Sequence, residues 1–233
     1  ALALLLGADL GSALMAQVLF LPVQALVPFA LIAGVGTFFK ARGRKAKQIG
    51  RILIGFALVL VSLSMIRTAT APISGNEIVQ SIAAYFQADL LSAYVIGALL
   101  AWAMHSSLAA VLVFATFAAT GLIAAPVAAA LVIGANLGGA RVPVVLLWSG
   151  DRPGQLIALG NLFARGGTTL VFIAILMSGP LPSTWLAVLT GQQAIALHIL
   201  VNVAVVVFAL PFATALIAAA ERVAPAKNMA GGD

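Results

Sequence analysis

The chain has 233 residues, of which 63% are hydrophobic and 8% are charged. This balance excludes an ordinary soluble globular domain, because such domains carry about one quarter charged residues. Twelve basic and six acidic residues give a formal net charge of +6, and the absence of cysteine excludes disulfides and thiolate metal sites.

Three apolar segments occupy the first part of the chain, at about residues 7–20, 26–39 and 52–66. A basic loop, residues 40–51, separates the second from the third and holds six of the twelve cations. Cytoplasmic loops of membrane proteins carry an excess of Lys and Arg. We therefore interpret this loop as a cytoplasmic topology signal and not as a nucleic-acid site.

A polar linker at residues 69–89 follows, and we expect it on the outer face of the membrane. Residues 90–125 are apolar but interrupted at Met104, His105, Ser106 and Ser107. This pattern is consistent with a re-entrant hairpin or with two full spans. Either one returns the chain to the outside.

The remaining segments cross the membrane three times in this interpretation. Residues 126–148 cross inward, residues 156–177 cross outward, and residues 185–220 return. The tail, residues 221–233, is then cytoplasmic, and it carries the cations Arg222 and Lys227.

The chain contains a short internal repeat, GADLGS at residues 7–12 and GANLGG at residues 134–139. By the charge argument the first copy runs outward and the second inward, which is an inverted-topology repeat. We predict an all-α membrane protein, a polytopic helical bundle with two inverted repeats (1–68 and 90–220), a re-entrant hairpin and broken transmembrane helices. Because the chain starts inside an apolar segment, we expect the hairpin of the first repeat to precede Ala1.

The two strings are candidate sites because Gly and Asx weaken a helix, and a broken membrane helix exposes backbone groups to a polar cavity. Its N–H groups could hold an anion and its carbonyls a cation. The alternative is that Gly7, Gly11, Gly134 and Gly138 form close contacts between helices. Asp9 is a functional candidate because acidic residues in apolar segments usually face a cavity or a partner.

Other polar residues interrupt the spans. His105, Ser106 and Ser107 could line a hairpin tip, although serines in membrane helices often bond their own backbone. Asn161, His198 and Asn202 also lie within spans. His198 and Asn202 share a helix face and are expected to be interhelical contacts by default. The two cations Arg141 and Arg165 could reach the interface or meet an anionic substrate.

These strings resemble those of the sodium-phosphate cotransporter family, the type II sodium-dependent phosphate transporters. That family has two inverted repeats, each with a Gln-Ser-Ser-Ser-Ala-type hairpin tip followed by a Gly-Ala-Asn-Ile-Gly-Thr-Thr-type string. Residues 134–138 match the second string, residues 105–109 resemble the tip, and residues 7–12 resemble the first string. The departures are His105 for Gln, Leu108 for the third Ser, Asp9 for Asn, and Gly139–Ala140 for the Thr pair.

The resemblance implies sodium-coupled symport of phosphate by alternating access in the plasma membrane, in a bacterium the inner membrane. It implies no enzyme activity and no organic cofactor, with sodium as coupling ion near Ser107, Asn136 and Asp9. The implied substrate- and ion-binding residues are Gly7, Asp9, Gly11, Ser12, His105, Ser106, Ser107, Gly134, Ala135, Asn136, Leu137 and Gly138. Secondary candidates are Arg141, Asn161, His198 and Asn202.

Other functions stay open at this point. The substrate could be another anion, and coupling could be to protons through His105. The rival classes are an intramembrane hydrolase that pairs a serine with His105 or His198, and a passive channel. The expected partners are phosphate or another small anion, sodium and the lipid bilayer, without nucleic acid; a homo-oligomer is left open.

Overall fold

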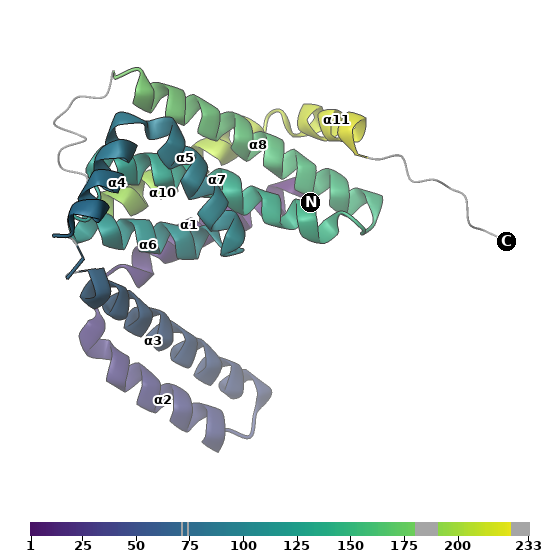
Figure 1. The fold of residues 1–233 in the computed structure, drawn as a ribbon. Helices are drawn as coiled ribbons and strands as arrows, with labels where there is room; N and C mark the ends of the chain where they lie inside the picture. The colour runs from purple at the N-terminus through teal and green to yellow at the C-terminus, as the bar shows by residue number, and fades with distance from the viewer. Residues whose placement is uncertain (71, 74, 180–190, 225–233) are drawn as a thin grey trace.

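The computed structural model describes residues 1–70, 72–73, 75–179 and 191–224 (Figure 1). Within these ranges every regular element is a helix, which confirms the all-α class. In chain order the elements are α1 (Leu2–Leu19), η1 (Gln24–Leu26), α2 (Val27–Lys40), α3 (Arg44–Thr70), α4 (Glu77–Ala88), α5 (Leu90–Ala103), α6 (Ser107–Ala119), α7 (Ala125–Leu147), α8 (Arg152–Met177), α10 (Gly191–Ala209) and α11 (Ala213–Val223).

Five of the described helices, α1, α3, α7, α8 and α10, are long and apolar enough to cross a membrane. A helix of about 20 residues covers the roughly 30 Å of the hydrocarbon core. Shorter apolar helices cover Gln24–Lys40 and Ser107–Ala119. The protein is therefore a multi-pass membrane protein.

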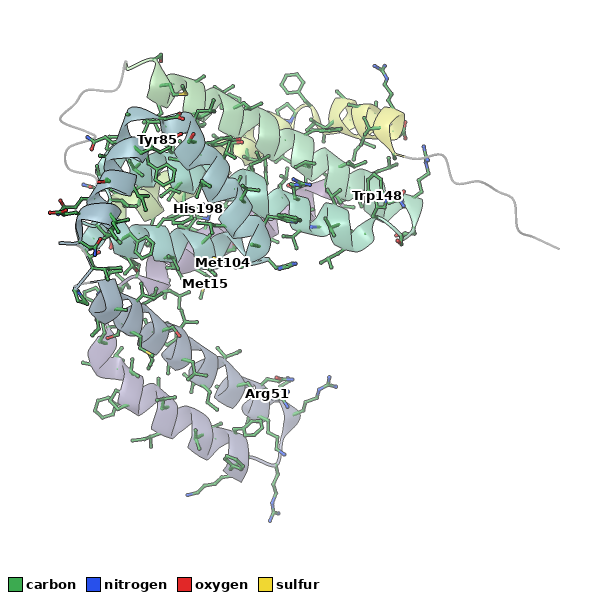
Figure 2. The ribbon with its side chains drawn as sticks, viewed as in Figure 1. Met15, Arg51, Tyr85, Met104, Trp148 and His198 are labelled. Atoms are coloured by element: carbon green, nitrogen blue, oxygen red, sulfur yellow. The ribbon has the colours of Figure 1, made fainter. Side chains whose placement is uncertain are left out.

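The long helices run between two ends of the molecule (Figure 1). The turns that join α2 to α3 and α7 to α8 lie at one end, and α4 lies at the other. Figure 2 shows the same division, with Arg51 and Trp148 toward one end and Tyr85 toward the other. This agrees with the alternation of sides inferred from charge. Which end faces the cytoplasm stays a prediction.

The pair α2 and α3 extends away from the other helices in Figure 1. Its backbones approach closely, because a Cβ on Gly50 would lie 2.8 Å from the carbonyl oxygen of Gly34. The predicted basic loop 40–51 is much shorter than expected, since α2 includes Lys40 and α3 begins at Arg44. Lys and Arg are good helix formers, so the helices continue through most of the charged run.

The predicted polar linker 69–89 is also partly helical, because it contains α4. Asn76 caps this helix, and its Oδ1 accepts a hydrogen bond from the backbone N–H of Ile78 at 2.9 Å. Asp89 caps α5 in the same way, accepting from Leu91 and Ser92 at 3.1 Å. The chain turns by 110° between α4 and α5.

The apolar segment 90–125 contains two antiparallel helices, α5 and α6, which are joined by a turn at residues 104–106 (Figure 1). The two helices have 14 and 13 residues. At 1.5 Å per residue each is about 20 Å long, which is shorter than the hydrocarbon core. Of the two alternatives left open by the sequence, these lengths favour the re-entrant hairpin over two full spans.

The predicted break in segment 126–148 is wrong, because α7 is a continuous helix of 23 residues through the GANLGG string. Its glycines instead bring α7 against α5. A Cβ on Gly134 would lie 2.0 Å from the carbonyl oxygen of Tyr94, and one on Gly138 would lie 2.0 Å from that of Ala98. The alternative of close helix contacts is therefore the correct one for this string.

The first string also lies within a continuous helix, α1, so it too is unbroken. Its glycines, however, make no close contact: nothing lies within 4 Å of a Cβ built on Gly7 or Gly11. The two copies thus differ in packing. In Figure 1, α1 and α7 run in opposite directions, which an inverted repeat requires, but the repeat itself stays a prediction.

The predicted span 185–220 does not form one helix. Residues 185–190 lie outside the described residues, α10 ends at Ala209, and α11 is a separate helix that begins at Ala213. Pro211 lies between them, and proline has no N–H for the helical hydrogen-bond ladder.

Candidate functional site

Six polar side chains from four helices meet inside the bundle, and we call them the central cluster. They are Asp9 of α1, Asn136 of α7, Asn161 and Arg165 of α8, and His198 and Asn202 of α10. The cluster lies near the middle of its helices, since Asn136 is eleven residues from either end of α7. Figure 2 shows His198 within the bundle. Polar groups at such depth are expensive in a membrane and usually functional.

Arg165 is the cation of this cluster. Its Nη1 lies 2.8 Å from Oδ2 of Asp9, and the side chains are 2% and 22% exposed, respectively. Its Nη2 donates a hydrogen bond of 3.0 Å to Oδ1 of Asn136. Asn161, one turn earlier on α8, donates its Nδ2 to the same Asp9 oxygen at 3.3 Å. The charge of the buried guanidinium is therefore neutralised by the only acidic side chain within 4.0 Å of it among the described residues.

Asn136 connects the other members of the cluster. Its Oδ1 accepts from Arg165 and from Nδ2 of Asn202, the latter at 2.9 Å. Its Nδ2 donates to the backbone oxygen of Val132 at 3.1 Å and lies 3.0 Å from Nδ1 of His198. The amide thus uses both its donor and its acceptor, which fixes its orientation.

The state of His198 follows from its partners. Nδ1 faces the amide nitrogens of Asn136 and Asn202, at 3.0 and 3.4 Å. An amide nitrogen can only donate, so Nδ1 accepts and the neutral imidazole carries its proton on Nε2. Asn202 also donates to the backbone oxygen of His198 at 2.8 Å, so it links its own helix to α7.

Three polar atoms of the central cluster are buried without a hydrogen-bond partner: Nε of Arg165, Nε2 of His198 and Oδ1 of Asn161. Two of them are N–H donors and one is an acceptor. Buried groups of this kind are rare in native proteins and require an explanation. Further binding capacity in the cluster is one such explanation.

The tip of the α5–α6 hairpin is a tightly closed turn. The N–H of His105 donates to the carbonyl of Trp102 at 3.0 Å, and that of Ser106 to Ala101 at 3.1 Å. His105 has a φ of 52°, a left-handed conformation usually occupied by glycine at a helix end. Ser106 caps α6, because its Oγ accepts from the N–H of Ala109 at 3.1 Å.

Ser107 of the tip packs against α7. A Cβ built on Gly139 would lie 2.8 Å from Cβ and 3.0 Å from Oγ of Ser107. Gly139 replaces the first Thr of the Thr pair expected from the resemblance, so the space of that side chain is taken by the serine. The tip therefore lies about one helical turn from Asn136 along α7.

The residues predicted from the sequence are only partly brought together. Asp9, Asn136, Asn161, His198 and Asn202 meet in the central cluster. Within the described part of the chain, no hydrogen bond joins this cluster to His105, Ser106 or Ser107. Ser12 bonds the backbone oxygen of Asp9 at 2.9 Å. Ala135 is buried, Leu137 is half-buried, and their side chains are apolar.

Arg141 does not belong to the cluster. It is exposed, and its guanidinium lies 5.1 Å from the centre of the Trp102 ring, a cation–π contact at the hairpin tip. Of the two cations that the sequence left unranked, the central one is thus Arg165. It was missing from the predicted site, although its position four residues after Asn161 places both on one face of α8.

The described residues contain no group of three or more His, Cys, Asp or Glu side chains that could hold a metal ion. Among the described residues, no hydrogen bond or ion pair joins any two of the predicted sodium ligands Ser107, Asn136 and Asp9. A cation beside Asn136 is disfavoured by charge, because its Oδ1 already accepts from the guanidinium of Arg165.

The described part of the chain contains no serine–histidine pair of the kind that the alternative hydrolase function requires. Nδ1 of His105 lies 3.0 Å from the backbone oxygen of Ala103, and His198 bonds asparagines. Neither imidazole therefore forms a hydrogen bond with a serine of the described residues, as a base that activates a nucleophile would require.

A sequence model of the family described as Na+/Pi-cotransporter matches residues 1–68. Over 212 residues the chain is also 35% identical to the Escherichia coli K12 protein named "Putative inorganic phosphate export protein YjbB". The chain is therefore similar to the Na+/Pi-cotransporter family over its first 68 residues and to this relative over most of its length. A protein of the same name from Salmonella typhimurium is 36% identical over 215 residues.

The match to these two relatives covers 91% of the chain and 39% of each relative's own length. The chain thus spans well under half the length of the curated relatives it matches. The matched region includes most of the described helices. No solved structure matches the chain.

Proposed function

We propose that the protein transports inorganic phosphate across the membrane by alternating access, coupled to the sodium gradient. The observation that carries this proposal is the central cluster, in which a buried Arg165 and several asparagine amides lie at the middle of four apolar helices. The match of residues 1–68 to the Na+/Pi-cotransporter family model and the names of the relatives support phosphate as the substrate class.

The chemistry of the cluster suits an oxyanion. A guanidinium presents several N–H donors in a planar fork that matches phosphate, and it keeps its charge at every physiological pH. Amide and imidazole N–H groups add neutral donors. Two buried N–H groups, on Nε of Arg165 and Nε2 of His198, have no hydrogen-bond partner in this state. An anion reaching this point would gain hydrogen bonds that the apolar surroundings make strong.

The hairpin tip supplies the second part of the proposed site. It places the N-terminus of α6, with Ser106 and Ser107, against α7 near Gly139. Helix N-termini attract anions, because their first N–H groups have no helical partner. In an alternating-access cycle we propose that the tip moves relative to α7 and connects the cluster to one side of the membrane.

The test is radiolabelled phosphate transport by the full-length protein in proteoliposomes. Influx and efflux are both measured, with and without a sodium gradient, because the relatives are named as export proteins. We expect gradient-driven accumulation in wild type and loss of it in Asn136→Ala. The control is Ser62→Ala, whose exposed hydroxyl bonds only the Leu58 carbonyl of its own helix. Equal transport in Asn136→Ala and wild type would contradict the site.

A further inference from the structure

Arg165 cannot offer its full charge to an anion in this conformation. Its Nη1 is paired with Asp9 at 2.8 Å, and its Nη2 with Asn136 at 3.0 Å. An anion that binds Arg165 must therefore compete with a carboxylate that is already present. Two negative groups beside one buried cation would leave a net negative charge in an apolar interior, which is strongly unfavourable.

The two partners of the pair differ in access. The guanidinium is 2% exposed, whereas the Asp9 carboxylate is 22% exposed. Asp9 is thus the partner with room to move, while Arg165 is held in the bundle.

A freed Asp9 would need a new positive partner. Oδ1 of Asn161 is a buried acceptor without a partner, on the side chain whose Nδ2 already bonds Asp9. A carboxylate and an amide oxygen side by side provide oxygen ligands for a small hard cation, and a carboxylate alone can take a proton. Both outcomes neutralise Asp9.

The charged groups around Asp9 agree with this exchange. Arg165 of α8 is its direct partner, and neutral His198 of α10 is reached through Asn136. The facing helix α6 carries no titratable side chain. From α3, Arg67 lies over the Phe20 ring beyond the far end of α1. Arg165 is therefore the dominant charge that Asp9 experiences.

We infer that Asp9 is an exchangeable counter-ion: the substrate anion displaces it from Arg165, and the freed carboxylate, with Asn161, binds the coupling cation. Anion and cation then bind together, because each removes the charge that the other would leave uncompensated. The cation is a monovalent ion taken up by a carboxylate, either sodium or a proton. The inference rests on the proposed phosphate transport and assigns its coupling site.

The first test is linkage in the wild-type, full-length protein. Phosphate affinity is measured in detergent while sodium is varied at fixed pH, and then while pH is varied without sodium. Coupled sites change each other's affinity by the same factor. Phosphate binding that tightens with sodium identifies sodium, and binding that tightens only with acid identifies the proton. Phosphate binding independent of both overturns the inference.

The second test is Asp9→Asn, with Asp89→Asn as the matched control. Asp89 is a carboxylate outside the cluster that caps α5, and asparagine caps as well as aspartate. Without cation, we expect Asp9→Asn to bind phosphate roughly tenfold tighter or more, because no carboxylate competes for Arg165. Without phosphate, the thermal midpoint of Asp9→Asn should be lower than that of wild type. Addition of phosphate should raise the midpoint of the variant by more than it raises that of wild type.

In proteoliposomes Asp9→Asn should exchange phosphate for phosphate but no longer respond to the cation gradient. A variant that binds phosphate with unchanged or weaker affinity, or keeps the wild-type cation response, overturns the inference. If wild type itself neither binds nor exchanges phosphate, the proposed function fails, and this inference fails with it. If wild type exchanges phosphate and Asp9→Asn has the same phosphate affinity and cation response as wild type, the inference alone fails and the proposed function stands.

Discussion

Asp9 of α1 and Arg165 of α8 form an ion pair of 2.8 Å at the centre of the bundle. The chain thereby connects its first helix to a helix of its second half at membrane depth. Removal of one partner of a buried pair leaves the other charge uncompensated, whereas removal of both does not. This asymmetry yields a first prediction.

Arg165→Gln should lower the free energy of unfolding by roughly 3–5 kcal/mol, and the double variant Asp9→Asn/Arg165→Gln should be more stable than the single one. The measurement is a double-mutant cycle on thermal or denaturant unfolding in detergent. Asp89→Asn combined with Arg165→Gln serves as control, since these residues share no contact and their effects should add. Additive effects for Asp9 and Arg165 would contradict the ion pair.

The two glycine strings give a matched prediction on packing. Gly134→Ala should strongly reduce the folded fraction, because its Cβ would lie 2.0 Å from the Tyr94 carbonyl oxygen in the α5–α7 contact. Gly7→Ala should be neutral or stabilising by up to about 1 kcal/mol, because its Cβ meets open space and alanine is the better helix former. Size-exclusion profiles after heating distinguish the two. Equal tolerance at both positions would show that α5 and α7 are not in contact.

The hairpin tip gives a prediction on backbone conformation. His105 has a φ of 52°, which costs a non-glycine residue roughly 1–2 kcal/mol relative to glycine. His105→Gly should therefore raise the thermal midpoint, whereas β-branched His105→Val should lower it. A lower midpoint for His105→Gly than for His105→Val would indicate that the imidazole, whose Nδ1 lies 3.0 Å from the Ala103 oxygen, contributes more than the conformation costs.

The sequence predicts the membrane class, the hairpin and five of the six cluster residues, because polar side chains in apolar segments are conspicuous. It cannot predict that Asp9 pairs with Arg165, since the two are distant in the chain and meet only after α1, α7, α8 and α10 have packed. From the sequence alone, Arg165 could equally reach the membrane interface or meet an anionic substrate.

The string GANLGG shows why a local pattern can have two meanings. Its glycines lower the helix propensity of an isolated segment. In α7, however, they let the backbone of α5 approach closely, and this packing offsets the lower propensity. Nothing in residues 134–139 says what lies opposite them. Similarly, Pro211 is a local signal for the end of α10, but the long apolar run around it suggests one continuous span.

The most direct measurement is phosphate transport by Asp9→Asn/Arg165→Gln in proteoliposomes, beside wild type and Asp89→Asn. The double variant removes both charges and leaves neither unpaired, so it should fold and insert. The account predicts that it carries no phosphate under any gradient, because the cation that attracts the anion is gone. Transport at the wild-type rate in a correctly inserted double variant would contradict the central claim that Arg165 binds the substrate.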